Sequence, residues 1–174
     1  MVNDNASTPG SPVKILPATW RDLGALQHLE RMSFPKDSWP LWDLIGILTL
    51  PEIVRLKAVL DGRMVGFIAS EYRSKEQVDW IATIAVLPGY QRRGIGAVLL
   101  NACEERTSGP NIRLCVRASN LAAIRLYERS GYYHLRTWSQ YYHDGEDAIV
   151  MEKCRPQPDR SSLTSAEVVY QRRP

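Results

Sequence analysis

The chain has 174 residues, of which 44% are apolar and 24% are charged, and this composition is typical of a globular protein with one domain. Its formal charge of +3 is small for a protein that binds nucleic acid through phosphate contacts, so we expect no nucleic-acid partner. No apolar run approaches the roughly 18 residues of a membrane-spanning helix, and residues 1–12 lack the features of a secretory signal, so we expect no membrane partner.

The two ends of the chain differ in composition from its middle. Residues 1–12 are polar and rich in proline and glycine, and residues 155–174 contain three prolines and a cluster of serine and threonine. Such segments bury too little apolar surface to fold by themselves. We therefore expect an N-terminal tail over residues 1–12, one domain over residues 13–154 and a C-terminal tail over residues 155–174.

The first part of the domain predicts one short strand and two helices. Residues 13–16 form an apolar run, and Thr19 is a suitable N-cap for a helix that runs to about Met32. The second helix is indicated by apolar residues that recur at i, i+3, i+4 and i+7, namely Leu41, Leu44, Ile45 and Leu48.

The middle of the domain predicts three strands. Residues 53–60 and 64–72 are apolar, strand-like runs, and Asp61-Gly62 between them is a hairpin signal. Residues 78–86 are nearly all apolar, as expected of a strand at the centre of a sheet that is covered on both faces.

The last part of the domain alternates helices with strands. A helix is predicted from about Gly94, and Ala118-Ser119 should open another helix that ends before Gly131. Further strands are predicted over residues 112–116, 132–138 and 148–153. The resulting order, β-α-α-β-β-β-α-β-α-β-β, indicates an α/β fold with a mixed seven-stranded sheet and four helices on its two faces.

The loop over residues 86–97, between a predicted strand and a predicted helix, has the features of an anion site. Gly94 and Gly96 permit backbone conformations that other residues resist. The first N–H groups of a helix have no partner within it and lie at the positive end of its dipole, which suits a pyrophosphate. Arg92 and Arg93 add positive charge. Neither the P-loop motif nor the complete three-glycine motif of dinucleotide-binding folds is present.

The same loop resembles a known signature. The segment Gln91–Ala97 is similar to the loop with which the GNAT superfamily of N-acetyltransferases binds the pyrophosphate of acetyl-CoA. Residues 116–120, 123–127 and 131–132 resemble the strand and helix that follow in that family. Phe34-Pro35, and Tyr141-Tyr142 followed by residues 145–148, resemble the branch that acetylates protein N-termini, which includes the bacterial enzyme for ribosomal protein S18 and its archaeal and eukaryotic relatives.

The resemblance implies a GNAT fold and an acetyl-CoA-dependent transfer to the α-amino group of protein N-termini, and the sequence offers no ligand spacing for a metal. Tyr127 is implied to protonate the departing thiolate, and Asn120 to contact the pantetheine. The acceptor peptide should lie against Phe34, Pro35, Tyr141 and Tyr142. The remaining cofactor contacts are implied for Ile84, Ala85, Val86, Gln91, Arg92, Arg93, Gly94, Ile95, Gly96 and Ala97.

The resemblance also implies a position for the base that takes the proton from the amine. At this position the chain has a different residue from the relatives. Bacterial relatives have a glutamate, and several eukaryotic relatives a histidine, where this chain has Cys115. A thiol with an ordinary pKa of about 8.5 is neutral at pH 7, and burial would raise that pKa, so the alternative interpretation of Cys115 is a small apolar filler. Asp79 is a substitute candidate that would act through water, and His134 and Glu71 are further ones, although each is also explained as a surface or structural residue.

The cysteines predict neither a disulfide framework nor a zinc site. Cys103, Cys115 and Cys154 are odd in number, widely spaced and without a CxxC pair. Free cysteines of this kind fit a reducing cytoplasm, which is the compartment we expect.

Three functions stay open at this point. At pH 7.4, neutralising an α-amino group costs under about 1 kcal/mol, whereas a lysine costs about 4 kcal/mol, so a site without a strong base favours a protein N-terminus. One alternative is an enzyme for a small amine such as a polyamine, an amino acid or an antibiotic. The other is a catalytically weak acyl-CoA-binding module, which only the missing carboxylate at Cys115 supports. The oligomeric state and any partner subunit are undetermined.

Overall fold

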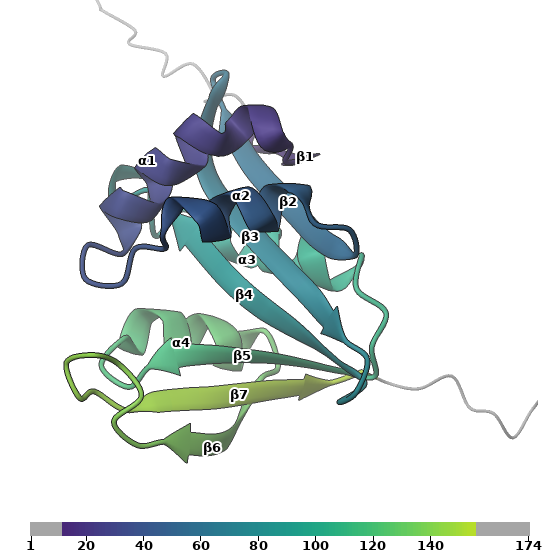
Figure 1. Ribbon diagram of the computed structural model, residues 1–174, viewed down its shortest axis with the longest axis vertical. Helices are drawn as coiled ribbons and strands as arrows, with labels where there is room; N and C mark the ends of the chain where they lie inside the picture. The colour runs from purple at the N-terminus through teal and green to yellow at the C-terminus, as the bar shows by residue number, and fades with distance from the viewer. Residues whose placement is uncertain (1–11, 156–174) are drawn as a thin grey trace, which may run out of the picture.

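A computed structural model describes residues 12–155. Seven strands form one mixed sheet in the order β1-β2-β3-β4-β5-β7-β6, with helices on both faces, which confirms the predicted fold class and element order (Figure 1). The strands are β1 (Lys14–Pro17), β2 (Ile53–Leu60), β3 (Arg63–Arg73), β4 (Val78–Val86), β5 (Asn111–Arg117), β6 (Tyr133–Trp138) and β7 (Ala148–Cys154). The helices are α1 (Leu23–Ser33), α2 (Leu41–Thr49), α3 (Ile95–Glu104) and α4 (Leu121–Arg129), with short 3-10 turns at Trp20–Asp22 and Pro88–Tyr90.

The first helix begins later than the sequence predicts. Thr19 does cap a turn, because its backbone N–H donates to the Asp22 carboxylate at 2.8 Å, but that turn is 3-10 and α1 follows it.

The start of α4 is also later than the predicted Ala118-Ser119. Asn120 is the N-cap, and its Oδ1 accepts a hydrogen bond from the Ala123 N–H at 3.2 Å. The side chain that the resemblance assigns to the pantetheine therefore also stabilises the helix.

Of the predicted N-terminal tail the structure describes only Pro12, and of the predicted C-terminal tail it describes only Arg155. The other residues of both tails lie outside the described residues. The Arg155 N–H donates to the Pro110 carbonyl oxygen at 2.8 Å, and its guanidinium donates to the carbonyl oxygens of Glu104 and Thr107. Contacts with the domain therefore continue one residue past β7.

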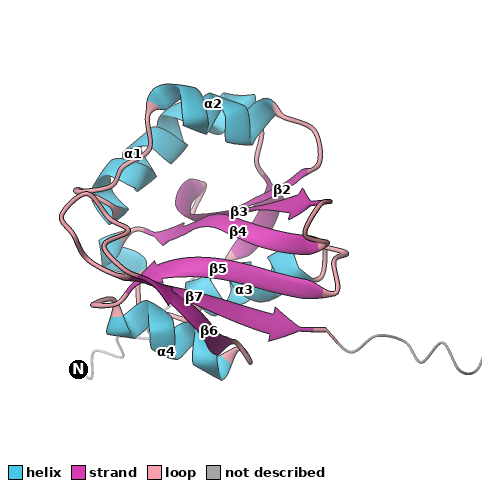
Figure 2. Ribbon diagram, turned by 60° about the horizontal axis from the view of Figure 1, so that its bottom comes forward, coloured by secondary structure: helices cyan, strands magenta, loops and turns pink. Residues whose placement is uncertain are grey.

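The sheet separates two apolar clusters. Helices α3 and α4 cover one face and α1 and α2 cover the other (Figure 2). Gly66 on β3 lets α3 approach closely, because a Cβ at this position would lie 2.9 Å from Leu99 Cδ1. Within the described residues no helix is long and apolar enough to cross a membrane.

The sheet opens between β4 and β5, and the cause is local. Parallel pairing runs from Val78 opposite Asn111 to Ile81 opposite Leu114 and then stops. At this point the register between β3 and β4 shifts and leaves Ala82 unpaired, which is a β-bulge that bends its strand. The two strands therefore diverge, as Figure 1 shows, and residues 82–86 of β4 keep one edge without a strand partner.

Candidate active site

A cavity of about 190 Å³ lies where β4 and β5 separate, and it connects the two faces of the sheet. The loop after α1 and the β6–β7 loop line it on the α1/α2 face, and α4 lines it on the opposite face. It brings together six residues that the sequence selected, namely Phe34, Ile84, Cys115, Asn120, Tyr127 and Tyr142. It also contains Asp37, Trp39 and Thr83, which sequence reasoning missed as site residues.

Tyr127 reaches the cavity from α4. It is 5% exposed and packs edge-to-face against Tyr132, with ring centroids 6.0 Å apart. Burial raises the pKa of Tyr127, and the nearby Cys115 raises it further. The phenol is therefore protonated throughout the neutral range, as a proton donor must be.

Cys115 is the first residue of β5 beyond the pairing with β4, and it is half-buried in the cavity wall. Burial raises the pKa of its thiol, and the neighbouring Tyr142 hydroxyl opposes that shift in part. The thiol is neutral at pH 7, so it is not an effective base.

The substitute bases do not line this cavity. Asp79 is 3% exposed, and its carboxylate accepts a hydrogen bond from the Gly109 N–H at 2.6 Å, which ties the loop before β5 to β4. His134 bonds Thr137 on β6, and Glu71 forms an ion pair with Arg73 at 2.7 Å. The contact of Asp79 with Gly109 agrees with the structural alternative for this residue, and its role as a base that acts through water stays a prediction.

The predicted phosphate loop has an open backbone. Gly94 is the N-cap of α3 and has φ +79°, a left-handed conformation that favours glycine, and no atom lies within 4 Å of where its Cβ would be. Arg92 and Arg93 are exposed, and the Arg93 guanidinium lies 5.3 Å from the Tyr90 ring. The first N–H groups of α3 and this positive charge are therefore open to an anion.

Other residues of the loop have packing roles. The Ile95 side chain is buried in the core, so only its backbone faces the loop. A Cβ on Gly96 would lie 3.2 Å from Leu126 Cδ2, so this glycine lets α4 pack against α3.

The β4 residues assigned to the pantetheine differ from one another. Ile84 lines the cavity, whereas Ala85 is buried among the α1/α2 cluster. The Val86 carbonyl oxygen accepts a hydrogen bond from Gln91 Nε2 at 3.0 Å. Gln91 thus closes the end of the strand, and Ile84 has the open position.

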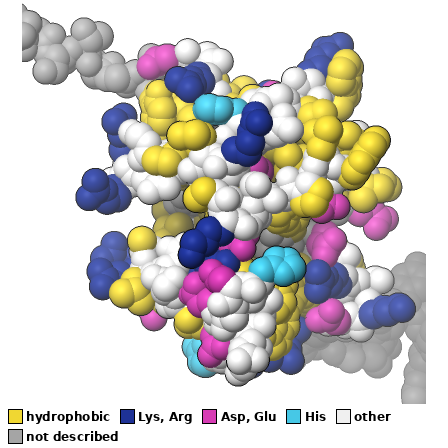
Figure 3. All heavy atoms as spheres, turned by 60° about the vertical axis from the view of Figure 1, so that its left-hand side comes forward, with side chains coloured by type: hydrophobic (Ala, Val, Ile, Leu, Met, Phe, Trp, Pro, Cys, Tyr) yellow, Lys and Arg dark blue, Asp and Glu magenta, His cyan; other side chains and the backbone are white. Residues whose placement is uncertain are grey.

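Arg117, at the end of β5, joins the two loops on the α1/α2 face. Its Nε and Nη2 donate to the two oxygens of Asp37 at 2.7 and 2.8 Å, and its Nη1 donates to Asp144 at 3.0 Å and to Glu146 at 2.6 Å. The guanidinium also lies 3.9 Å from the centre of the Tyr142 ring. Charged side chains of both signs gather in the middle of this face (Figure 3).

The four predicted acceptor residues divide into two pairs. Phe34 and Tyr142 line the cavity, whereas Pro35 and Tyr141 are exposed. The Tyr141 ring lies 5.2 Å from that of Trp138, outside the cavity. The tyrosine pair therefore has one ring directed inward and one outward.

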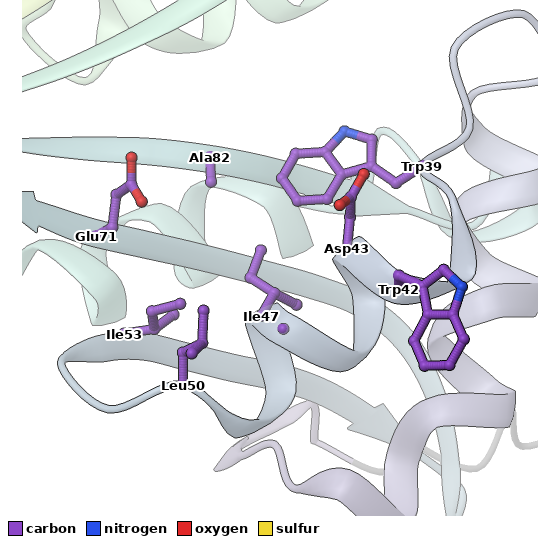
Figure 4. A pocket seen from close by; sticks show the side chains of 9 residues that line it. Trp39, Trp42, Asp43, Ile47, Leu50, Ile53, Glu71 and Ala82 are labelled. Atoms are coloured by element: carbon purple, nitrogen blue, oxygen red, sulfur yellow. The ribbon is translucent and has the colours of Figure 1, made fainter.

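A second, more open cavity of about 500 Å³ adjoins the first and shares Trp39 and Ala82 with it. Figure 4 shows Ile47 in the middle of this groove, with Glu71 on one side and Trp39 and Asp43 on the other. The groove is thus apolar in the middle and carries two carboxylates. Across residues 12–155 there is no group of three or more His, Cys, Asp or Glu side chains that could hold a metal ion.

Comparison with known proteins identifies the family of this site. Residues 21–132 match the Acetyltransferase (GNAT) family. An uncharacterized N-acetyltransferase of Methanocaldococcus jannaschii is 35% identical over 78% of this chain and 88% of its own length, and an N-alpha-acetyltransferase of Sulfurisphaera tokodaii is 30% identical over 82% and 93%. The crystal structure of the ribosomal-protein-S18-alanine N-acetyltransferase from Escherichia coli superposes with a TM-score of 0.76 at 29% identity, over 86% of this chain and 97% of the other.

Proposed function

The chain belongs to the GNAT family of acetyltransferases, and we propose that it transfers the acetyl group of acetyl-CoA to the α-amino group of protein N-termini. The observation that carries this proposal is the cavity between β4 and β5. It places Tyr127 from one face of the sheet and Phe34 and Tyr142 from the other at one opening. Two substrates that arrive from opposite faces would meet there, which is the requirement for direct transfer.

The residues present fit acetyl-CoA. The unpaired edge of β4 offers backbone N–H and C=O groups to an extended amide chain, as an added strand would use them. The start of α3, with Gly94 and the exposed Arg92 and Arg93, offers N–H groups and positive charge to a pyrophosphate. Bound acetyl-CoA would supply the thioester, and Tyr127 would hold the proton for its sulfur.

Two observations support an α-amine as the acceptor. The archaeal relative is named an N-alpha-acetyltransferase, and the E. coli structure is that of an enzyme for a ribosomal-protein N-terminal alanine. Independently, the neutral Cys115 thiol leaves the site without a strong base, which an amine of pKa near 8 tolerates better than a lysine of pKa about 10.4. The residues after the first would lie in the neighbouring groove beside Trp39.

The test measures CoA release from acetyl-CoA with three kinds of acceptor. These are free peptides that differ in their first residue, the same peptides with a blocked N-terminus and an internal lysine, and spermidine. We expect turnover with free N-termini alone. Turnover with spermidine and no free peptide would replace the proposal by small-amine acetylation, and tight CoA binding without turnover on any acceptor would indicate an acyl-CoA-binding module.

A further inference from the structure

A buried carboxyl stands behind the acceptor side of the cavity. Glu30, in the last turn of α1, is 1% exposed, and its Oε1 accepts a hydrogen bond from the Thr83 hydroxyl at 3.2 Å. Thr83 in turn lines the cavity. The second oxygen of Glu30, Oε2, is buried and has no hydrogen-bond partner among the described residues, which is rare for a buried polar atom.

No cation among the described residues neutralises this carboxyl. The packed elements offer it one hydrogen bond, from the Thr83 hydroxyl on β4 to Oε1. The titratable side chains that line the adjoining cavities are Asp37, Asp43, Glu71, Cys115, Arg117, Tyr127 and Tyr142. Burial is the largest cause of the shift in the pKa of Glu30, and no charged side chain is among its causes.

Burial raises the pKa of Glu30 to about 6, against the opposing effects of the hydrogen bond from Thr83 and of the nearby Trp39 backbone N–H. The carboxyl is therefore ionised at pH 7.4 but accepts a proton more readily than an exposed glutamate. A group with these properties suits proton transfer at neutral pH.

We propose that Thr83 and Glu30 form a relay that takes the proton from the acceptor's α-ammonium group. The inference rests on the proposed function. The Thr83 hydroxyl has one proton, and because that proton is donated to Glu30, the hydroxyl lone pairs are free to accept an N–H in the cavity. Thr83 is the residue that would contact the substrate, and Glu30 positions its hydroxyl and stores the proton.

The step balances as follows. One ammonium proton passes to Thr83 Oγ1 while the hydroxyl proton passes to Glu30 Oε1, which leaves a neutral amine. The amine lone pair forms the C–N bond with the acetyl carbonyl carbon, and the C–S bond then breaks. Tyr127 gives its proton to the thiolate. The nitrogen, which still carries two protons after the attack, then gives one of them to Tyr127 and becomes the amide. The net product is one proton on Glu30, which later returns to solvent.

The relay discriminates between amines. Moving a proton from an α-ammonium group of pKa about 8 to a carboxyl of pKa about 6 is unfavourable by about a hundredfold. From a lysine of pKa about 10.4 it is unfavourable by more than about ten-thousandfold. Thr83 and Glu30 therefore reinforce selection for N-termini.

The test compares four variants of the full chain with saturating acetyl-CoA and the best free peptide. Thr83→Val keeps the side-chain shape without the hydroxyl, and both it and Glu30→Gln should lower kcat about a hundredfold with unchanged KM for acetyl-CoA. Thr83→Ser should restore kcat to within a few-fold. Ser33→Ala is the matched control, because Ser33 is a buried hydroxyl one turn along α1 that does not line the cavity, and it should behave as the wild type.

Two further readouts separate this inference from the proposed function. The wild-type kcat should fall below about pH 6 as Glu30 is protonated, and that limb should be absent in Glu30→Gln. If the wild type acetylates peptides and Glu30→Gln has the same kcat and pH profile, the relay is wrong and the function stands.

A measurement without turnover decides the case in which no free peptide reacts. Carbon-13 NMR of labelled glutamate carboxyls should show one group that titrates near pH 6, is lost in Glu30→Gln and moves in Thr83→Val. Such a group would support the coupled pair even if the acceptor is not a peptide. The absence of any glutamate carboxyl that titrates above about pH 5 overturns the relay whatever the acceptor.

Discussion

The two faces of the cavity are held in place by different interactions. On the α3/α4 face, Tyr127 packs against Tyr132, and Gly94 and Asn120 set the starts of two helices. On the α1/α2 face, polar contacts join segments far apart in the chain, because Arg117 binds Asp37 across 80 residues and Thr83 binds Glu30 across 53. The cofactor side should therefore respond to changes of shape, and the acceptor side to changes of charge and pH.

The largest effect is expected from Tyr127→Phe on the α3/α4 face. The change keeps the ring that packs against Tyr132 and removes only the hydroxyl, so the shape of this face should survive. We expect kcat to fall by about 10² to 10⁴, the range for a lost proton donor. Calorimetry should show an unchanged Kd for CoA. An unaltered kcat would remove Tyr127 from the role of acid.

Arg117→Gln tests the α1/α2 face by removing its charged contacts. It removes the hydrogen bonds to Asp37 and to the β6–β7 loop, so both loops that border the acceptor lose their common support. Charge-assisted hydrogen bonds of this kind are each worth more than a neutral one, so we expect KM for the peptide to rise about tenfold with little change in kcat. Steady-state kinetics at saturating acetyl-CoA measures both.

Two control variants sharpen the Arg117 result. Arg117→Lys keeps the charge but not the two-pronged geometry, so it should rescue KM only in part. Arg113→Gln changes another ion-paired arginine of the same strand that does not line the cavity, and it should leave KM unchanged. Equal KM values for Arg117→Gln and the wild type would show that the loops hold their positions without this contact.

The same comparison explains what the sequence could predict. The element order follows from apolar periodicity, and the fold confirms it. The phosphate loop also follows from a local pattern, glycine at the start of α3, and it stays a prediction that the left-handed φ of Gly94 permits. The acceptor side depends on partners that no local pattern specifies. The pairing of Arg117 with Asp37 requires the loop after α1 to lie beside the end of β5, which only the folded sheet determines.

Two carboxylates illustrate the limit. The sequence does contain a signal for Glu30, because Leu26, Leu29 and Glu30 fall at i, i+3 and i+4 on the buried side of α1, where a charge is unexpected. Asp79 is a candidate base in the sequence because it lies on the strand next to that of Cys115, but its carboxylate accepts a hydrogen bond from the Gly109 N–H. A buried acid is therefore informative only when its partner is known.

Glu30→Gln should affect stability as well as rate, and with a distinct pH dependence. The folded state raises the pKa of Glu30 from 4.5 to about 6, so it favours the protonated form. The unfavourable charge is absent below about pH 4.5, grows as the pH rises to about 6, and then costs about 2 kcal/mol. The variant should gain up to that amount at pH 8 and nothing at pH 4.5, measured by urea unfolding against the wild type at each pH.

Arg117→Gln is the control for this stability gain, because its effect on the free energy of unfolding should have the opposite sign. The pKa of Asp144 is lowered mainly by its hydrogen bond with Arg117, and that of Glu146 mainly by the Ser119 backbone N–H, so their contribution is lost as the pH falls below their ordinary values of 3.8 and 4.5. Arg117→Gln should thus lose stability at pH 8 and converge with the wild type in acid. A gain for Glu30→Gln that does not vary with pH would contradict the assignment.

The smallest effect is expected from Gly94→Ala at the start of α3. A Cβ at this position meets no atom within 4 Å, so crowding within the protein is not the problem. The left-handed φ of +79° costs an L-residue about 1–2 kcal/mol, and relief of that strain would turn the first N–H groups of α3 away from an anion. We expect Kd for CoA to rise about tenfold by calorimetry while kcat at saturation changes little.

Gly89→Ala, in the same loop with equal open space and no left-handed φ, is the matched control and should bind CoA as the wild type does. If both variants bind CoA normally, the loop backbone does not need its left-handed turn; if both fail equally, the loop is sensitive to any added side chain, and the distinction between shape on this face and charge on the other must be redrawn.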